Sequence, residues 1–179
     1  MTYKIGILMD PIASIKVHKD SSLAMLLAAH RRGWSLFYME MRDLFLDDGR
    51  VQARSRPLQV RDDPEDHFSL GSEQTRPLDT FHAVLMRKDP PFDMEYIYAT
   101  YLLELAQQQG CLVVNDPRAL RDANEKLFTA RFPECCPPLT VTADARRLRD
   151  FLDTHEDIVL KPLGGMGGED EVAEDARDY

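Results

Sequence analysis

The stretch YKIGILMDP, residues 3–11, decides the fold. Residues 3–9 form a short apolar run, and the turn pair Asp10-Pro11 ends it. An apolar run of this length is typical of a strand that is buried on both faces of a parallel sheet. We therefore predict a buried strand over residues 3–9, with Asp10 at its carboxyl end.

The next residues predict a helix and a second strand. The run SLAMLLAAHRRG (22–33) places three leucines on one face, carries arginines in its last turn and stops at a glycine. Ser21 or Ser22 is expected to cap this helix. WSLFYME (34–40) is the second strand. A strand, a helix and a strand joined by short turns form a right-handed βαβ unit, so the predicted fold class is α/β.

Residues 41–80 are polar and rich in turns, and they predict a mobile excursion from the sheet, with a hairpin turn at Asp48-Gly49 and VQARSRPLQV (51–60) as the returning strand of that hairpin. The alternation of strand and helix then resumes. We expect a strand in FHAVLMR (81–87), a helix in DMEYIYATYLLELAQQQG (93–110) capped by Asp93, and a strand in CLVVND (111–116).

The rest of the chain has a different pattern. DPRALRDANEKLFTARF (116–132) reads as two short helical pieces and PECCPP (133–138) as a linker. ADARRLRDFLDTH (143–155) is an amphipathic helix and DIVLKPL (157–163) a strand. Because the first sheet is complete by then, we expect a domain boundary near Ala123.

Composition limits the kind of partner. The 31 acidic residues outnumber the 22 lysines and arginines, giving a net charge of −9. This balance argues against nucleic-acid binding, which needs clustered cations. No segment reads as a signal peptide or a membrane span, so we expect a cytoplasmic protein with small-molecule or protein partners and no membrane. The three cysteines form no CxxC pair and are expected to be reduced thiols.

A glycine loop, GGMGG (164–168), follows the last predicted strand. Glycines let a backbone approach a polyphosphate closely, but such a loop also serves as a flexible turn. Lys161 precedes the loop and Lys126 lies further upstream. Both could supply countercharge to a triphosphate, or could simply be solvated lysines.

Polar residues also follow the predicted strand 81–87. Arg87, Lys88 and Asp89 lie at its carboxyl end, where ligands commonly bind in α/β sheets. Arg87 could hold a substrate carboxylate by a bidentate contact or could be a surface cation. Asp10 has the same position on the first strand, with a turn-forming role as its alternative.

Together these motifs resemble the bacterial glutathione synthetase family of ATP-grasp ligases. The likeness runs to Gly168 and lies in GILMDPI, KDSSLAMLLAAHRRG, YMEM, VLMRKDPPFDMEYIYATYLLE, VVNDPRALRDANEKLFT and LKPLGGMGG. It implies a Rossmann-like, parallel-sheet substrate domain that precedes the ATP-grasp domain (1–122), followed by the first part of that ATP-grasp domain (123–168).

The resemblance also implies an activity and assigns residues. The family joins γ-glutamylcysteine to glycine through an acyl phosphate in glutathione biosynthesis, uses ATP and Mg²⁺, and is known for homo-oligomers. By this likeness Lys126 and Lys161 match the two lysines that contact ATP. Gly164, Gly165, Met166, Gly167 and Gly168 match the loop that covers its phosphates.

The resemblance stops at the acidic tail, residues 169–179. Glu169, Asp170 and Glu171 would oppose a bound triphosphate, and the family's late metal ligands are not found in the chain. We therefore expect a frameshifted or truncated ligase that is inactive alone. The alternative is a non-catalytic fragment or interaction module that keeps the N-terminal domain.

Overall fold

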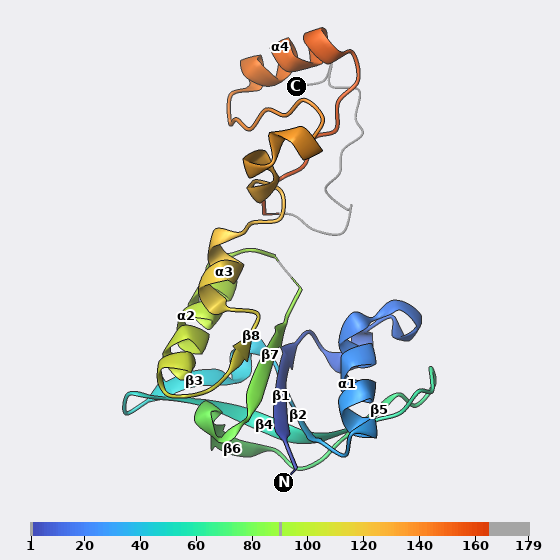
Figure 1. Cartoon of the computed structure of the whole chain (residues 1–179), viewed down its shortest axis with the longest axis vertical. Helices are drawn as coiled ribbons and strands as arrows, with labels where there is room; N and C mark the ends of the chain where they lie inside the picture. Colours follow the sequence, from blue (N-terminus) through green and yellow to red (C-terminus); the bar gives the residue numbers. More distant parts are fainter. Residues whose placement is uncertain (1, 90, 165–179) are drawn as a thin grey trace. The chain divides into compact units, whose positions relative to one another are not determined.

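The computed structural model describes residues 2–89 and 91–164 (Figure 1). The described chain divides into two compact units. The first holds residues 2–89 and 94–121, and the second holds 91–93 and 122–164. No helix in these residues has the length and apolar character needed to cross a membrane.

The first unit is built on a parallel sheet centre. Strand β1 (Lys4–Met9) pairs in parallel with β2 (Ser35–Met39) on one side and with β7 (Ala83–Arg87) on the other. β7 pairs in parallel with β8 (Val113–Val114). Helix α1 (Ser21–Arg31) makes the crossover between β1 and β2. The predicted βαβ unit and the α/β fold class are therefore confirmed.

Helices flank this sheet (Figure 1). α1 packs on the face that carries the apolar side chains of β1 and β2, and its Leu23 and Leu26 are buried there. Helix α2 (Met94–Gln108) contacts β3, β4 and β8 and buries one side of its own. Full burial of a leucine or isoleucine side chain stabilises a fold by about 1.5–3 kcal/mol, so these two helix faces fix the layers.

The cap of α1 differs from the prediction. Asp20, rather than Ser21 or Ser22, is the N-cap, because its backbone is extended while Ser21 is already helical. The carboxylate of Asp20 accepts a hydrogen bond from the backbone N–H of Leu23 at 2.7 Å. Both serine hydroxyls are thereby left to other partners.

The polar segment 41–80 corrects a second expectation. It is not an excursion, because it supplies β3 (Leu44–Asp47), β4 (Arg50–Val60), β5 (Phe68–Leu70) and β6 (Gln74–Pro77) to the same sheet. β4 runs antiparallel to β2 and to the other three, so the sheet is mixed rather than purely parallel.

The predicted hairpin turn between β3 and β4 is confirmed. Asp48 and Gly49 have φ angles of 46° and 72°. Two central residues with positive φ are the pattern of the tight turn that matches the twist of antiparallel strands.

Short helices complete the first unit. They are η1 (Ile12–Ser14), η2 (Val17–Lys19), η3 (Met41–Asp43), η4 (Leu78–Thr80) and the start of α3 (Pro117–Asp122).

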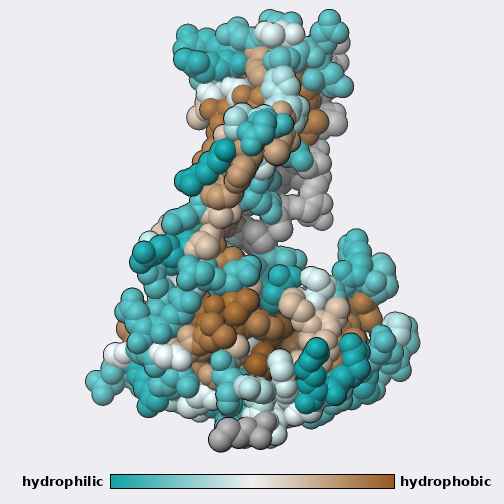
Figure 2. Space-filling model, viewed as in Figure 1, coloured by the Kyte–Doolittle hydropathy of each residue, from teal (hydrophilic) through white to brown (hydrophobic). Residues whose placement is uncertain are grey.

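In its described part, the second unit is helical. It holds η5 (Phe128–Arg131), η6 (Pro133–Cys135) and the amphipathic α4 (Ala145–His155), whose visible side is hydrophilic in Figure 2. The strand predicted over 157–163 is wrong, because only Leu160 forms an isolated bridge. A strand needs a partner ladder, and residues 122–164 contain no second strand.

Candidate functional site

The carboxyl ends of β1 and β7 form one polar edge of the sheet. Met9 and Arg87 are paired across the two parallel strands. Asp10 and Lys88 each follow one member of this pair, so the sheet brings them together although 78 positions separate them in sequence. Three of the four predicted substrate residues therefore meet at this edge: Asp10, Lys88 and Asp89.

Asp10 holds both of the others. One carboxylate oxygen lies 2.8 Å from the ammonium of Lys88, and the second accepts a hydrogen bond from the backbone N–H of Asp89 at 2.9 Å. Lys88 also donates to the carbonyl oxygen of Asp89. The Lys88 side chain is only 15% exposed and that of Asp10 is 35% exposed, so solvent screens this ion pair incompletely. Asp10 thus anchors the segment after β7.

Arg87, the fourth predicted residue, reaches the start of α1. Its guanidinium donates to the hydroxyl of Ser22 at 3.1 Å and to that of Ser21 at 2.8 Å. None of the ion pairs among residues 2–89 and 91–164 involves Arg87. A guanidinium that is oriented by neutral hydroxyls can still pair with the carboxylate of an anionic ligand.

The second unit positions one predicted lysine beside the segment that leads to the glycine loop. The ammonium of Lys126 donates to the carbonyl oxygen of Pro162. Asn124 supports the same segment, because its side-chain amide donates to the carbonyl oxygen of Leu163 at 3.2 Å. The side-chain oxygen of Asn124 also accepts from the backbone N–H of Lys126 at 3.1 Å. Lys126 therefore lies close to residues 162–163.

The other predicted phosphate-binding residues are only partly described. Lys161 is exposed. Apart from the chain neighbours of Gly164, no atom of the described residues lies within 4 Å of the place where a Cβ on Gly164 would lie. Close packing therefore does not explain the glycine at position 164. Gly165, Met166, Gly167 and Gly168 lie outside the described residues, as does the acidic tail.

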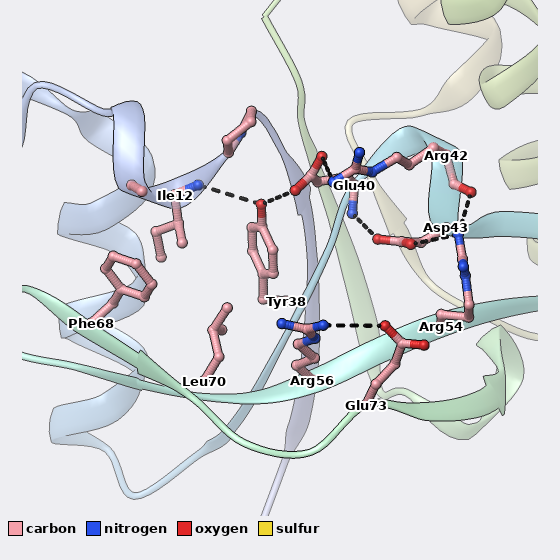
Figure 3. Close-up of a pocket in the computed structure, with 12 residues that line it drawn as sticks. Ile12, Tyr38, Glu40, Arg42, Asp43, Arg54, Arg56, Phe68, Leu70 and Glu73 are labelled. Atoms are coloured by element: carbon pink, nitrogen blue, oxygen red, sulfur yellow. Dashed lines mark hydrogen bonds and ion pairs between the residues drawn. The ribbon is translucent and has the colours of Figure 1, made fainter.

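The first unit also has a pocket of about 220 Å³ that the sequence did not predict (Figure 3). It opens beyond the C-terminal end of β2, where η1, η3, β4 and β5 meet. Apolar side chains of Ile12, Phe68 and Leu70 form one wall, and three arginines with three acids form the other. Those charged residues are Arg42, Arg54, Arg56, Glu40, Asp43 and Glu73.

Tyr38 lies between the two walls of the pocket (Figure 3). Its hydroxyl donates to a carboxylate oxygen of Glu40 at 2.8 Å and accepts from the backbone N–H of Ile12 at 3.4 Å. Burial, with the neighbouring Glu40 carboxylate second, raises the pKa of the Tyr38 phenol far above its ordinary value. The phenol therefore stays neutral, and its hydroxyl is a polar group held in place inside the pocket by these two hydrogen bonds.

Ion pairs link the side chains of the charged wall, and these pairs differ in distance and exposure. Arg54 lies 3.1 Å from Asp43 and also donates to the backbone carbonyl of Arg42 at 3.1 Å. Arg56 and Glu73 are 3.5 Å apart, with side chains 48% and 45% exposed. The Arg56–Glu73 pair is therefore the looser contact.

One sequence signal indicates the charged face of β4 that contributes to this pocket. Arg54 and Arg56 alternate with buried residues along RVQARSRPLQV, which is the period of a half-buried strand.

Among residues 2–89 and 91–164, no group of three or more His, Cys, Asp or Glu side chains could hold a metal ion.

The chain matches two protein-family models. The family model of the prokaryotic glutathione synthetase N-terminal domain matches residues 3–121, and that of the prokaryotic glutathione synthetase ATP-grasp domain matches residues 125–178. A glutathione synthetase of Pseudomonas putida is 57% identical over 168 residues, which cover 94% of this chain and 53% of that protein. A glutathione synthetase of Shewanella oneidensis is 58% identical over 165 residues, 92% of this chain and 52% of that protein.

A solved structure shares the fold. The ATP-grasp ligase PsnB, determined in complex with a minimal precursor, superposes with a TM-score of 0.50 at 16% identity, over 98% of this chain and 59% of that one. The chain spans about half the length of the curated relatives it matches. On the family model that covers residues 3–121, the chain belongs to the prokaryotic glutathione synthetase family.

Proposed function

We propose that this chain is part of an ATP-dependent carbon–nitrogen ligase that joins γ-glutamylcysteine to glycine through an acyl phosphate, in glutathione biosynthesis. Family membership supports the reaction class. The observation that carries the proposal to particular residues is the polar edge at the ends of β1 and β7, with Arg87 oriented by two hydroxyls.

The proposed roles follow from the chemistry of each group. The Arg87 guanidinium would hold a carboxylate of the dipeptide substrate, because its planar fork matches two carboxylate oxygens. The ion-paired Asp10 and Lys88, with Asp89, would fix the loop that borders the substrate. We propose this substrate role for the domain of residues 1–122 and assign residues 123–168 to the first part of the ATP-grasp domain.

The second unit would contribute to nucleotide binding. Two lysines near a glycine loop suit the phosphates of ATP, which supplies the phosphoryl group that activates the substrate carboxylate. Lys126, Lys161 and residues 164–168 would hold those phosphates. We assign Mg²⁺, which the family uses, to no residue among 2–89 and 91–164, because no suitable ligand group occurs there.

The experiment is phosphate release from ATP, measured on purified protein of confirmed mass. Release that requires both γ-glutamylcysteine and glycine would support the ligase. It should be measured on the 179-residue chain and on a protein extended to the full length of the relatives. We expect the extended protein to turn over, and substrate binding without turnover from the 179-residue chain. Phosphate release by the extended protein that is independent of glycine would contradict the proposed reaction.

The second candidate is a non-catalytic interaction module. The observation that favours it is that the sheet, both flanking helices and the buried core lie within one unit, residues 2–89 and 94–121. Such a unit could fold and keep family subunit contacts, and we propose a cytoplasmic homo-oligomer in either case. Sedimentation of the purified chain would test the oligomer.

A further inference from the structure

The pocket around Tyr38 has no place in the proposed ligase reaction. It lies at the end of β2 and is lined by residues of η1, η3, β4 and β5, whereas the polar edge lies at the ends of β1 and β7. Its residues come from positions 11–73 of the chain. We therefore considered which ligand its two walls could recognise.

The charge of the pocket narrows the class of ligand. Three arginines and three acids line it, so their formal charges cancel. A polyanion such as a nucleoside triphosphate would meet three carboxylates as well as the arginines, and a bare cation would meet the guanidinium groups. A ligand that carries one positive and one negative charge matches both sets.

The arginines are not equally available for such a ligand. Arg54 is held by the Asp43 carboxylate and a backbone carbonyl. Arg56 has a 3.5 Å contact with Glu73, and about half of each side chain is exposed. Exposed ion pairs contribute little stability, so a ligand carboxylate could replace Glu73 on Arg56 at small cost. Glu73 would then be available to a ligand ammonium group.

The apolar wall of the pocket requires that part of the ligand be apolar. Phe68 and Leu70 of β5 are partly buried and pack against the core, and Ile12 is 2% exposed. Figure 3 shows Arg56 between these apolar side chains and Glu73. A side chain that covered Phe68 and Leu70 would gain the free energy of removing their remaining apolar surface from water.

The volume of the pocket, about 220 Å³, limits the size of the ligand. At about 30 Å³ for each displaced water, a space of this kind holds roughly seven waters, so it admits a ligand of fewer than about ten non-hydrogen atoms. Drug-sized ligands need pockets of about 300–1,000 Å³. A free aliphatic α-amino acid has the required size, the two opposite charges and the apolar side chain.

We propose that the Tyr38 pocket binds an aliphatic α-amino acid, with its carboxylate on Arg56, its ammonium group near Glu73 and its side chain against Phe68 and Leu70. This site is separate from the proposed glycine substrate, because glycine lacks the side chain that the apolar wall requires. The neutral Tyr38 hydroxyl would mark the boundary between the polar and apolar parts of the ligand.

The test is a titration of the ¹⁵N-labelled 179-residue chain with L-leucine, followed by amide chemical shifts. We expect saturable shifts at Phe68, Leu70 and Glu73, with a dissociation constant of about 1 mM, as for a small ligand with few contacts. Arg56→Gln should weaken binding by about tenfold or more. Arg50→Gln removes an exposed β4 arginine that pairs with Asp79 outside the pocket, and it should leave the affinity unchanged within about twofold.

Ligand analogues test the same proposal without any variant. Leucinamide lacks the carboxylate, 4-methylpentanoate lacks the ammonium group and glycine lacks the side chain, and each should bind about tenfold more weakly. The proposal is overturned by the absence of saturable shifts, by equal affinity of Arg56→Gln and the unaltered chain, or by equal affinity for leucine and any analogue. Shifts confined to Asp10 and Lys88 would also overturn it, because they would place leucine at the polar edge.

Discussion

The ammonium of Lys88 lies 2.8 Å from a carboxylate oxygen of Asp10, although the two residues belong to different segments of the chain. The parallel pairing of β1 with β7 creates this contact, because Met9 and Arg87 stand side by side and the next residue on each strand is charged. The same carboxylate accepts the backbone N–H of Asp89. A single aspartate therefore fixes the position of both residues that follow β7.

Replacing Asp10 should release that segment. We expect Asp10→Ala to lower the free energy of unfolding by about 1–2 kcal/mol, because a hydrogen bond and a partly shielded ion pair are lost together. Exchange of the Asp89 amide hydrogen should also become faster, since the acceptor is gone. Urea unfolding and amide exchange measure the two effects.

A matched control distinguishes release of the segment after β7 from the general effect of losing an ion pair. Asp79→Ala removes a 2.7 Å ion pair with Arg50 elsewhere on the sheet. It should cost similar or less stability and leave the exchange of the Asp89 amide unaltered. Unaltered Asp89 exchange in Asp10→Ala would mean that Asp10 does not hold this segment.

Arg87 offers a test of the proposed substrate edge. Arg87→Lys keeps the charge but loses the planar fork, so γ-glutamylcysteine should bind the 179-residue chain about tenfold more weakly by calorimetry. The double change Ser21→Ala with Ser22→Ala keeps the guanidinium but removes the hydroxyls that orient it, and an intermediate loss is expected.

Arg32→Lys serves as the control for Arg87. Arg32 follows the last residue of α1, donates to the backbone carbonyl of Ala28 and lies 6.0 Å from the Trp34 ring, away from the ends of β1 and β7. Substrate binding should be unaffected by this change. If Arg87→Lys also bound the dipeptide as well as the unaltered chain, Arg87 would be a brace between β7 and α1 and nothing more.

The sequence predicted the parallel centre of the sheet because its signals are local. The apolar run before Asp10, the leucine face of the first helix and Gly33 at its end each lie within one element. Asp10, Arg87 and Lys88 could be placed at the same edge for the same reason: strands in a βαβ arrangement bring their carboxyl ends together.

The remaining features depend on contacts between distant segments. β4 exposes Arg54 and Arg56 on one face and buries Ala53 and Ser55 on the other, so a strand could be predicted there, but its pairing with β2, β5 and β6 could not. The Tyr38 pocket is assembled from five or more segments, and no local pattern reports its shape. The strand predicted over 157–163 is not formed, and among residues 122–164 there is no second strand to pair with it.

Cys111 should make stability depend on pH in the alkaline range. Burial, helped by the Asp79 charge, raises the pKa of the Cys111 thiol from 9.0 to about 11. A raised folded-state pKa favours the folded protein fully below pH 9, and this contribution is lost as pH rises from 9 towards 11. Cys111→Ala removes the thiol, so its unfolding free energy should fall less steeply than that of the unaltered chain across this window.

The control for this titration is Cys135→Ala, because Cys135 is exposed. Its unfolding free energy should follow the unaltered chain from pH 8 to pH 11. The quantity to compare is the difference between each variant and the unaltered chain, which cancels the lysines and tyrosines that titrate in the same range. A Cys111→Ala curve parallel to that of the unaltered chain would show that the buried thiol is not linked to folding.

Helices α1 and α4 allow tertiary burial to be separated from helix propensity. Both have 11 residues, and in both an aspartate N-cap accepts a hydrogen bond from a backbone N–H of the first turn. α1 buries Leu23 and Leu26, whereas α4 has no buried residue and its Leu148, Phe151 and Leu152 are only half-buried.

Helices of this length are marginal in water without packing. We therefore expect amide hydrogens of α4 to exchange at least about 1,000-fold faster than those of α1 and β1 under native conditions, as mass spectrometry or NMR would measure. Equal protection in the two helices would mean that α4 is stabilised by a partner surface in solution, and addition of mild urea would then show whether α4 unfolds together with the sheet or separately.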